Sequence, residues 1–390
     1  MKLFIYLFLS IIISATNIFG QNLTKVGMTT TLFSDESRTN WQGTAPRPIL
    51  TTIWYPSDGK TSEEQVVIGS PEKPVFINGN AAKDAKISSS KKRYPLIVLS
   101  HGTGGSALQL MWLGQFLAAR GFIVAAVNHH GNTGAEDKPA AQGFILWWER
   151  ATDLKVVLDK LLADSKFGER IDSKRIGAAG FSLGGATVTA LAGGIFNLNA
   201  FDKFCASSEH DATCDPQPEF PTAMKDFEVL KTKDPIVIQS LKRAENSYKD
   251  SRIKAVFEIA PALGASFTPA SLSAINIPVQ IVVGESDSTA PAKTNAQKIA
   301  QNIKQSKINI LPGKVAHYTF LSECSPFGKS VVPICNDAEG VDRNQVHQQV
   351  SEMAFQFFQK HLQTGRSTFR RKLVGLSVTS SAMEKRIFSL

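Results

Sequence analysis

Short apolar runs alternate with longer amphipathic segments through most of this 390-residue chain, and that alternation limits the folds open to it. The short runs are apolar on both faces, as the strands of a parallel sheet covered by helices must be. We therefore predict an α/β protein with a mostly parallel central sheet and helices on both faces. The predicted strands are 49–55, 96–100, 122–127, 175–180, 253–259, 278–283 and 307–311, and the predicted helices are 108–120, 147–164, 184–192, 294–303 and 344–362.

Two segments interrupt this alternation. Residues 57–93 are polar and rich in Ser, Lys, Gly and Pro, so we predict an irregular excursion there. Residues 196–250 are also polar and lie between a predicted core helix and the strand at 253–259. We predict that 196–250 is an insertion that lies like a lid over the carboxyl-terminal edge of the sheet, where open α/β sheets bind their ligands.

Both ends of the chain differ from the middle. Lys2 precedes an apolar run at 3–13 and then small and polar residues, a pattern typical of a signal peptide, which we assign to residues 1–20. The last segment, 363–390, has six basic side chains and one acidic side chain. We predict a secreted or periplasmic protein with a folded domain at 21–362. The basic tail would have a membrane surface as its only partner, and it would contact that surface weakly.

Composition excludes two broad classes of protein. Hydrophobic residues make up 43% of the chain, which is enough to bury a core and excludes global disorder. The net charge of +9 comes mostly from the two ends of the chain. The folded body is therefore only slightly basic, and we expect no nucleic-acid partner.

The four cysteines fall into two close pairs. Cys205 and Cys214 are nine positions apart, and Cys324 and Cys335 are eleven apart. Four cysteines allow three disulfide pairings, and in an exported protein we predict the local one. Neither pair has the spacing of a zinc site, so we expect no metal.

A G-x-S-x-G motif at residues 180–184 directly follows one predicted strand and precedes a helix. This context is typical of a serine nucleophile, which must sit on a sharp strand-to-helix turn with small neighbours. We therefore predict Ser182 as a nucleophile. The backbone N–H of Leu183, the next residue, would stabilise an oxyanion. A second N–H would come from the glycine-rich loop after the strand at 96–100, from Thr103 or, as the alternative, from Gly102.

A serine nucleophile needs a base and an acid. His317 follows the last predicted strand and is our candidate for the base, and Asp287, after the strand at 278–283, is our candidate for the acid. Glu258, at the end of the preceding strand, is the alternative acid. Arg150 and Asp153 are spaced to form an ion pair on one helix.

The motifs at 99–105, 128–133, 149–154, 180–185, 260–264, 284–291 and 317–320 together resemble those of the α/β-hydrolase superfamily. More narrowly, they are similar to a secreted branch related to dienelactone hydrolases and platelet-activating-factor acetylhydrolases. The resemblance covers residues 25–362 and implies an α/β-hydrolase fold with an inserted lid-like segment. Ser182 stands where dienelactone hydrolases proper have a cysteine, and acetylhydrolases have their acid at the position of Glu258.

These observations predict a secreted serine hydrolase. It would cleave carboxylic esters of short-chain or lipid-derived acids through a Ser182–His317–Asp287 triad and an acyl-enzyme. We expect no metal or organic cofactor. The alternatives are a peptidase or amidase on the same fold, and a binding protein that uses the fold without catalysis.

Overall fold

The computed structural model describes residues 23–363. The predicted signal peptide and nearly all of the predicted basic tail lie outside these residues, so the division of the chain at 20 and 362 stays a prediction. Within the described residues, no helix is long and apolar enough to cross a membrane.

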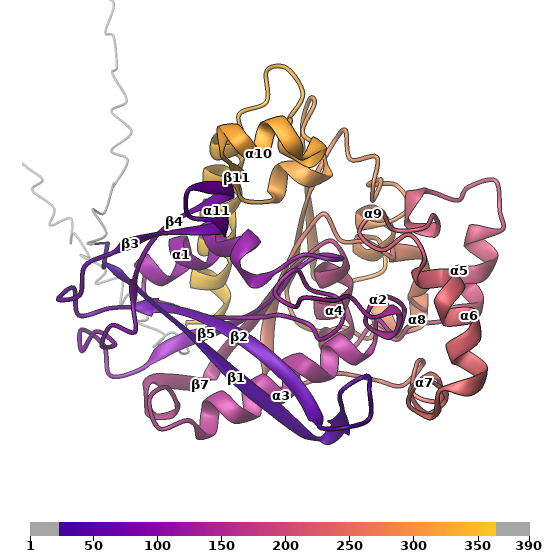
Figure 1. Cartoon of the computed structure of the whole chain (residues 1–390), viewed down its shortest axis with the longest axis horizontal. Coiled ribbons are helices and arrows are strands. Elements are labelled where there is room, and N and C mark those ends of the chain that lie inside the picture. The colour runs from indigo at the N-terminus through magenta and orange to yellow at the C-terminus, as the bar shows by residue number, and fades with distance from the viewer. Residues whose placement is uncertain (1–22, 364–390) are drawn as a thin grey trace, which may run out of the picture.

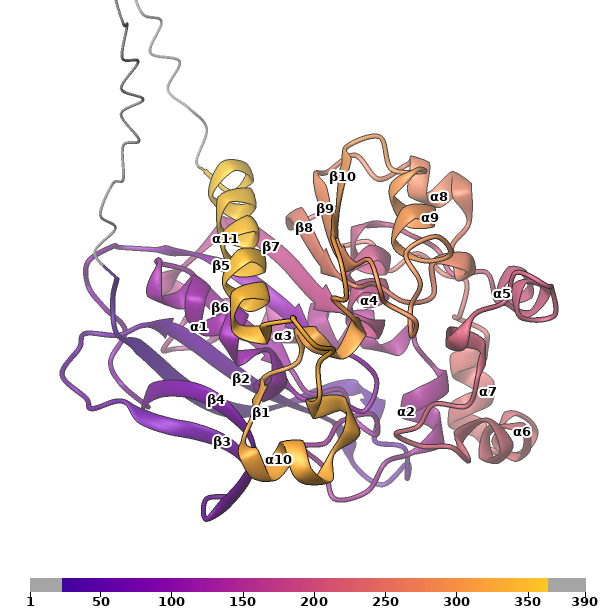
Figure 2. The same ribbon diagram turned by 90° about the horizontal axis from the view of Figure 1, so that it is seen from above.

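An eleven-stranded sheet forms the centre of the protein (Figures 1 and 2). The main strand order is β10-β9-β8-β7-β5-β6-β2-β1-β4-β11, and β3 pairs with β4. The run from β10 to β6 is parallel, whereas β2 joins β6 and β1 in antiparallel pairing. The strands are β1 (Val26–Thr39), β2 (Pro46–Pro56), β3 (Glu64–Ser70), β4 (Lys73–Lys83), β5 (Tyr94–Ser100), β6 (Ile123–Val127), β7 (Ile171–Phe181), β8 (Ile253–Ile259), β9 (Val279–Gly284), β10 (Ser306–Leu311) and β11 (Glu323–Cys324).

Helices cover both faces of the sheet. Helices α1 and α11 pack against each other, and α3 and α4 form a second contacting pair. The central strands β5, β6, β8 and β9 consist almost entirely of buried residues because both of their faces are covered. The helices are α1 (Met111–Ala119), α2 (Ala141–Ile145), α3 (Glu149–Ala163), α4 (Leu183–Ala192), α5 (Leu198–Cys205), α6 (Ala223–Lys233), α7 (Pro235–Leu241), α8 (Pro269–Ser273), α9 (Ala296–Ala300), α10 (Pro326–Val331) and α11 (Arg343–His361).

The structure confirms the predicted fold class and every predicted strand, and it corrects the account of the first hundred residues. The expectation of irregular structure throughout 57–93 is wrong, because β3 and β4 form an antiparallel hairpin there. Strand β1 was not predicted. Its side chains are mostly half-buried or exposed, so it lacks the apolar run that marks a buried strand.

The insertion at 196–250 is helical for much of its length. It contains α5, α6 and α7, which lie together at the right-hand side of Figure 1. Helix α6 packs against α2, which links the insertion to the loops at this edge of the sheet.

Candidate active site

Ser182 lies on a tight turn between β7 and α4. Its backbone has φ of 56° and ψ of −120°, a left-handed conformation that is costly for a residue with a side chain. A Cβ atom on Gly180 would collide with the backbone of Gly184, and one on Gly184 would collide with the backbone of Ser100. Both motif glycines are therefore required by close backbone contacts around the turn.

His317 and Asp287 meet Ser182 in one hydrogen-bonded line. The Ser182 hydroxyl lies 2.9 Å from Nε2 of His317, and Nδ1 of His317 lies 2.7 Å from Oδ2 of Asp287. The other oxygen of Asp287 accepts from the backbone N–H groups of Thr289 and Ala290, which fixes the carboxylate. Because the carboxylate accepts from Nδ1, Nε2 is the ring atom that accepts from the serine hydroxyl. All three side chains are buried.

Glu258 lies elsewhere. It is fully buried at the end of β8, where one carboxyl oxygen accepts from the Thr189 hydroxyl at 2.8 Å and the other has no hydrogen-bond partner. Burial raises the pKa of Glu258 to about 8, and the bond from Thr189 only partly opposes that rise. His317 bonds to Asp287, so the geometry favours Asp287 over Glu258 as its partner.

Thr103 and Leu183 lie beside Ser182 on the wall of one cavity. Leu183 is the first residue of α4, where backbone N–H groups have no partner within the helix. In the part of the chain that the structure describes, neither the Thr103 N–H nor the Leu183 N–H donates to a protein acceptor. Both groups are therefore available to stabilise negative charge.

The glycine-rich loop rests on buried polar groups. Nε2 of the His101 ring accepts from the His129 backbone N–H at 3.2 Å, and the Arg150 guanidinium donates to the His101 carbonyl. Arg150 also lies 3.4 Å from the Ser100 hydroxyl, whereas its Nε and Nη1 atoms have no hydrogen-bond partner. Burial lowers the pKa of Arg150 to about 9.

The expected pair between Arg150 and Asp153 is wrong. The fully buried Asp153 instead bonds Arg38 at 2.6 Å, Arg47 at 2.8 Å and Nδ1 of His129 at 2.9 Å. Arg38 and Arg47 come from β1 and β2, more than a hundred residues earlier in the chain. The spacing rule used for the prediction applies within one helix, so it cannot predict partners that come from distant strands.

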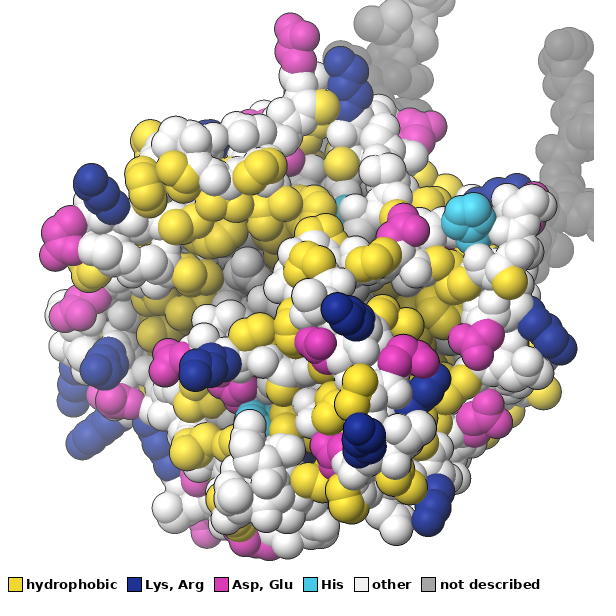
Figure 3. Space-filling model, turned by 45° about the vertical axis from the view of Figure 1, so that its right-hand side comes forward, with side chains coloured by type: hydrophobic (Ala, Val, Ile, Leu, Met, Phe, Trp, Pro, Cys, Tyr) yellow, Lys and Arg dark blue, Asp and Glu magenta, His cyan; other side chains and the backbone are white. Residues whose placement is uncertain are grey.

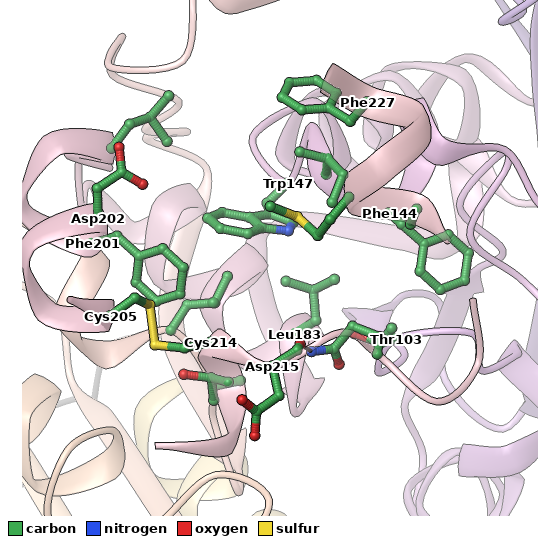
Figure 4. Close-up of a pocket in the computed structure, with 18 of the residues that line it drawn as sticks. Thr103, Phe144, Trp147, Leu183, Phe201, Asp202, Cys205, Cys214, Asp215 and Phe227 are labelled. Atoms are coloured by element: carbon green, nitrogen blue, oxygen red, sulfur yellow. Dashed lines mark hydrogen bonds between the residues drawn. A yellow bond between two sulfur atoms is a disulfide. The ribbon is translucent and has the colours of Figure 1, made fainter. Parts of the chain in front are cut away.

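A cavity of about 320 Å³ opens on one side of Ser182. Figure 4 shows the rings of Phe144, Trp147, Phe201 and Phe227 around the space next to Leu183. Phe201 and Phe227 belong to the insertion, and Trp147 packs edge-on against Phe201 with ring centroids 5.2 Å apart. In Figure 3, hydrophobic side chains also cover most of the walls of a hollow left of centre.

A second cavity of about 160 Å³ also borders Ser182, and its lining includes His317 and Tyr318. Gln217 and Glu219 bring the insertion into this wall as well. Sequence reasoning predicted an insertion over this edge but not these side chains, because no motif marks which of its residues turn inward.

Comparison with known proteins shows similar sequence segments and a similar fold. Residues 86–202 match the sequence model of a family described as PETase, PET hydrolase-like. The structure of a ferulic acid esterase from Streptomyces cinnamoneus is similar, with a TM-score of 0.57 at 20% sequence identity. The similarity covers 88% of this chain and 94% of that one. This similarity shows that the chain has an α/β-hydrolase fold.

Curated relatives match this chain over one segment. Lipase 1 of Moraxella sp. (strain TA144) is 36% identical over 83 residues, which are 21% of this chain and 23% of that protein. Cutinase est1 of Thermobifida alba is 33% identical over 101 residues, which are 25% of this chain and 30% of that protein. The match thus spans less than a third of either relative. The narrower resemblance to dienelactone hydrolases and acetylhydrolases stays a prediction.

Two disulfides connect nearby parts of the chain. Cys205 bonds Cys214 in the insertion, and Cys324 bonds Cys335 in the segment between β11 and α11. The structure therefore contains the local pairing predicted from the sequence.

Proposed function

We propose that this protein is an exported serine hydrolase that cleaves carboxylic esters. The observation that carries the proposal is the hydrogen-bonded line from the Ser182 hydroxyl through His317 to Asp287. The ester-cleaving relatives named above support the reaction class.

The proposed reaction has two halves. Ser182 Oγ attacks the acyl carbonyl while Nε2 of His317 takes the hydroxyl proton, and Asp287 stabilises the imidazolium that forms. The Thr103 and Leu183 N–H groups stabilise the oxyanion of the tetrahedral intermediate. The bond to the alcohol oxygen then breaks, and that oxygen leaves with the proton from His317. Water, deprotonated by His317, releases the acid from the acyl-enzyme by the same steps.

The two disulfides support export. Structural disulfides persist in oxidising compartments and are rare in the cytosol. The signal peptide proposed for residues 1–20 would deliver the chain to such a compartment.

A p-nitrophenyl ester series from acetyl to palmitoyl tests the proposal, with wild type and Ser182→Ala assayed side by side. We expect turnover by wild type and a loss on the order of 10⁴-fold or more in the variant. A wild type that is folded but hydrolyses no ester would contradict the proposal and favour an amide substrate or a binding role. Equal rates in both proteins would exclude Ser182 as the nucleophile.

A further inference from the structure

A third cavity, of about 370 Å³, is lined mainly by residues of α1, α11 and β4. Helix α1 packs against both α11 and β4 (Figures 1 and 2). Among the described residues, none lines both this cavity and either of the cavities at Ser182. Its volume is in the range of small-molecule binding sites, and the proposed ester hydrolysis does not use it.

Both helices turn one face toward the cavity. Their lining residues recur at the three- and four-residue spacing of a single helix face. These residues are Trp112, Gln115 and Phe116 on α1, and Asn344, His347, Gln348 and Ser351 on α11. Amide side chains therefore make up much of the polar lining, and Asn78 of β4 adds another.

The Asn78 amide is buried without partners. Its residue is 5% exposed, and within residues 23–363 neither Oδ1 nor Nδ2 of Asn78 has a hydrogen-bond partner. A buried amide in this state costs folding free energy, so it calls for an explanation. Because Asn78 lines the cavity, a ligand there can supply both missing partners. The amide donates and accepts, which matches a ligand group that does the same, such as a hydroxyl.

The lining carries little charge. Glu323, which is exposed, is the one carboxylate among the described lining residues, and they include no lysine or arginine. Burial, together with the nearby Arg343 charge, lowers the pKa of His347 to about 3, so this ring is neutral at physiological pH. An anionic ligand would therefore find no counter-charge here, and the lining favours a neutral one.

The aromatic wall is already held in position. Trp112 and His347 stack with ring centroids 4.2 Å apart and 2° between their planes. Nε1 of Trp112 donates to the Phe320 carbonyl at 3.0 Å, and Nε2 of His347 donates to the Thr319 carbonyl at 3.0 Å. A wall that is fixed in advance loses little conformational freedom when a ligand binds.

We propose that this cavity binds a neutral sugar and that the Asn78 amide pairs with the sugar hydroxyls. The C–H groups of a sugar ring pack on aromatic surface, and its hydroxyls donate to and accept from amides. The site is separate from both cavities at Ser182, so a bound sugar leaves Ser182 accessible.

Isothermal titration calorimetry of the whole protein with glucose, xylose, cellobiose and maltose tests the proposal. At least one of these sugars should bind with a Kd on the order of 1 mM or below. Asn78→Leu removes the amide at similar side-chain volume and should weaken this binding about 10-fold or more. Asn80→Leu is the matched control, because Asn80 is an exposed residue of the same strand that does not line the cavity. Absence of binding by all four sugars, or an equal Kd in Asn78→Leu and wild type, would overturn the proposal.

Thermal unfolding without sugar separates recognition from a structural role. The Asn78 amide has no partner among the described residues, so Asn78→Leu should leave the Tm unchanged or raise it. A marked fall in Tm would show that the amide supports the fold and would overturn its assignment to a ligand.

Gln348→Ala and Gln349→Ala form a second matched pair, on α11. Both glutamines are exposed, but of the two only Gln348 lines this cavity. Gln348→Ala should weaken sugar binding about 3-fold or more, and Gln349→Ala should not change it. Equal Kd values in the two variants would place the sugar elsewhere and overturn the site.

Two further probes test the class of ligand. Gluconate carries a carboxylate beside hydroxyls like those of glucose, and N-acetylglycine methylamide carries amides without hydroxyls. Both should bind more weakly than the best neutral sugar, and tighter binding of either would overturn the assignment to a neutral sugar. Ester turnover that depends on Ser182 tests the proposed function separately, so failure of sugar binding leaves that function standing.

Discussion

Asp287 follows β9 and Glu258 lies near the end of the neighbouring parallel strand β8, but only Asp287 hydrogen bonds His317, at 2.7 Å. Asp287→Asn should lower kcat on the order of 10⁴-fold, because the asparagine amide favours the wrong tautomer of the histidine. Steady-state kinetics on a p-nitrophenyl ester measure this directly. Glu258→Gln is the control and should retain most of the activity. A near-native rate in Asp287→Asn together with a collapse in Glu258→Gln would reverse the assignment.

Glu258 should make stability depend on pH. Its pKa is about 8 in the folded protein and near 4.5 when exposed, so the folded state binds more protons between these values. Stability should therefore fall as pH rises from about 4.5 to 8, by a few kcal/mol in all. Glu258→Gln removes this titration. The Tm of the variant should therefore rise relative to that of wild type as the pH increases from 5 to 8.5. A constant Tm difference across that range would contradict the prediction.

Arg150 should act on catalysis through the glycine-rich loop. Arg150→Met removes the donor to the His101 carbonyl and also a buried charge with two unpartnered nitrogens. We expect kcat to fall about 10-fold or more with little change in KM, because the Thr103 N–H is less well positioned. Stability should hold or rise, since the loss of an incompletely paired buried charge offsets the loss of its contacts. A large drop in Tm with unchanged kcat would instead mark Arg150 as purely structural.

Asp153 should be the most sensitive carboxylate outside the proposed triad. It is the common acceptor for Arg38, Arg47 and His129, and its side chain is fully buried. Asp153→Asn should destabilise the protein by about 3–5 kcal/mol, because the buried Arg47 loses its counter-charge and Arg38 keeps only Asp35 and Glu149. Asp159→Asn is the control. The Asp159 side chain is 66% exposed and pairs with Arg252, so its replacement should change the free energy of unfolding by less than about 1 kcal/mol. Denaturant unfolding of both variants provides the comparison.

Both disulfides should contribute to stability, but they should differ in their effect on activity. Replacing either pair by alanines releases a loop of similar length and should cost about 2–3 kcal/mol. Loss of Cys205–Cys214 should also raise KM for p-nitrophenyl esters, because both cysteines line the larger cavity beside Ser182, whereas loss of Cys324–Cys335 should change KM less. Thermal unfolding and ester kinetics on both double variants measure the two effects. Equal kinetics in both would exclude the insertion disulfide from the substrate site.

The strands and site residues that depend on local sequence pattern could be predicted. The strands at β5 and β8 were found because their residues are apolar on both faces, and Ser182 because the turn it occupies requires glycines at 180 and 184. His317 and Asp287 were found by their position after strands. The hydrogen bonds of both residues agree with that reasoning, whereas their catalytic roles are part of the proposed function.

Long-range and weakly patterned features were missed. Strand β1 and the β3–β4 hairpin have many polar and exposed residues, so their sequences resemble loops. The partners of Asp153 are set by strand packing across the whole domain. The inward side chains of the insertion, such as Glu219, depend on how a segment without regular periodicity folds back over the sheet.

The insertion bears on how this protein could change during evolution. The proposed triad comes from the ends of β7, β9 and β10, whereas Phe201, Phe227 and Glu219 come from one continuous stretch of chain between α4 and β8. Substitutions in that stretch alter the walls of both cavities without touching the proposed reacting groups. A mutant library confined to residues 198–241 would therefore sample new substrate preferences with the proposed chemistry held constant.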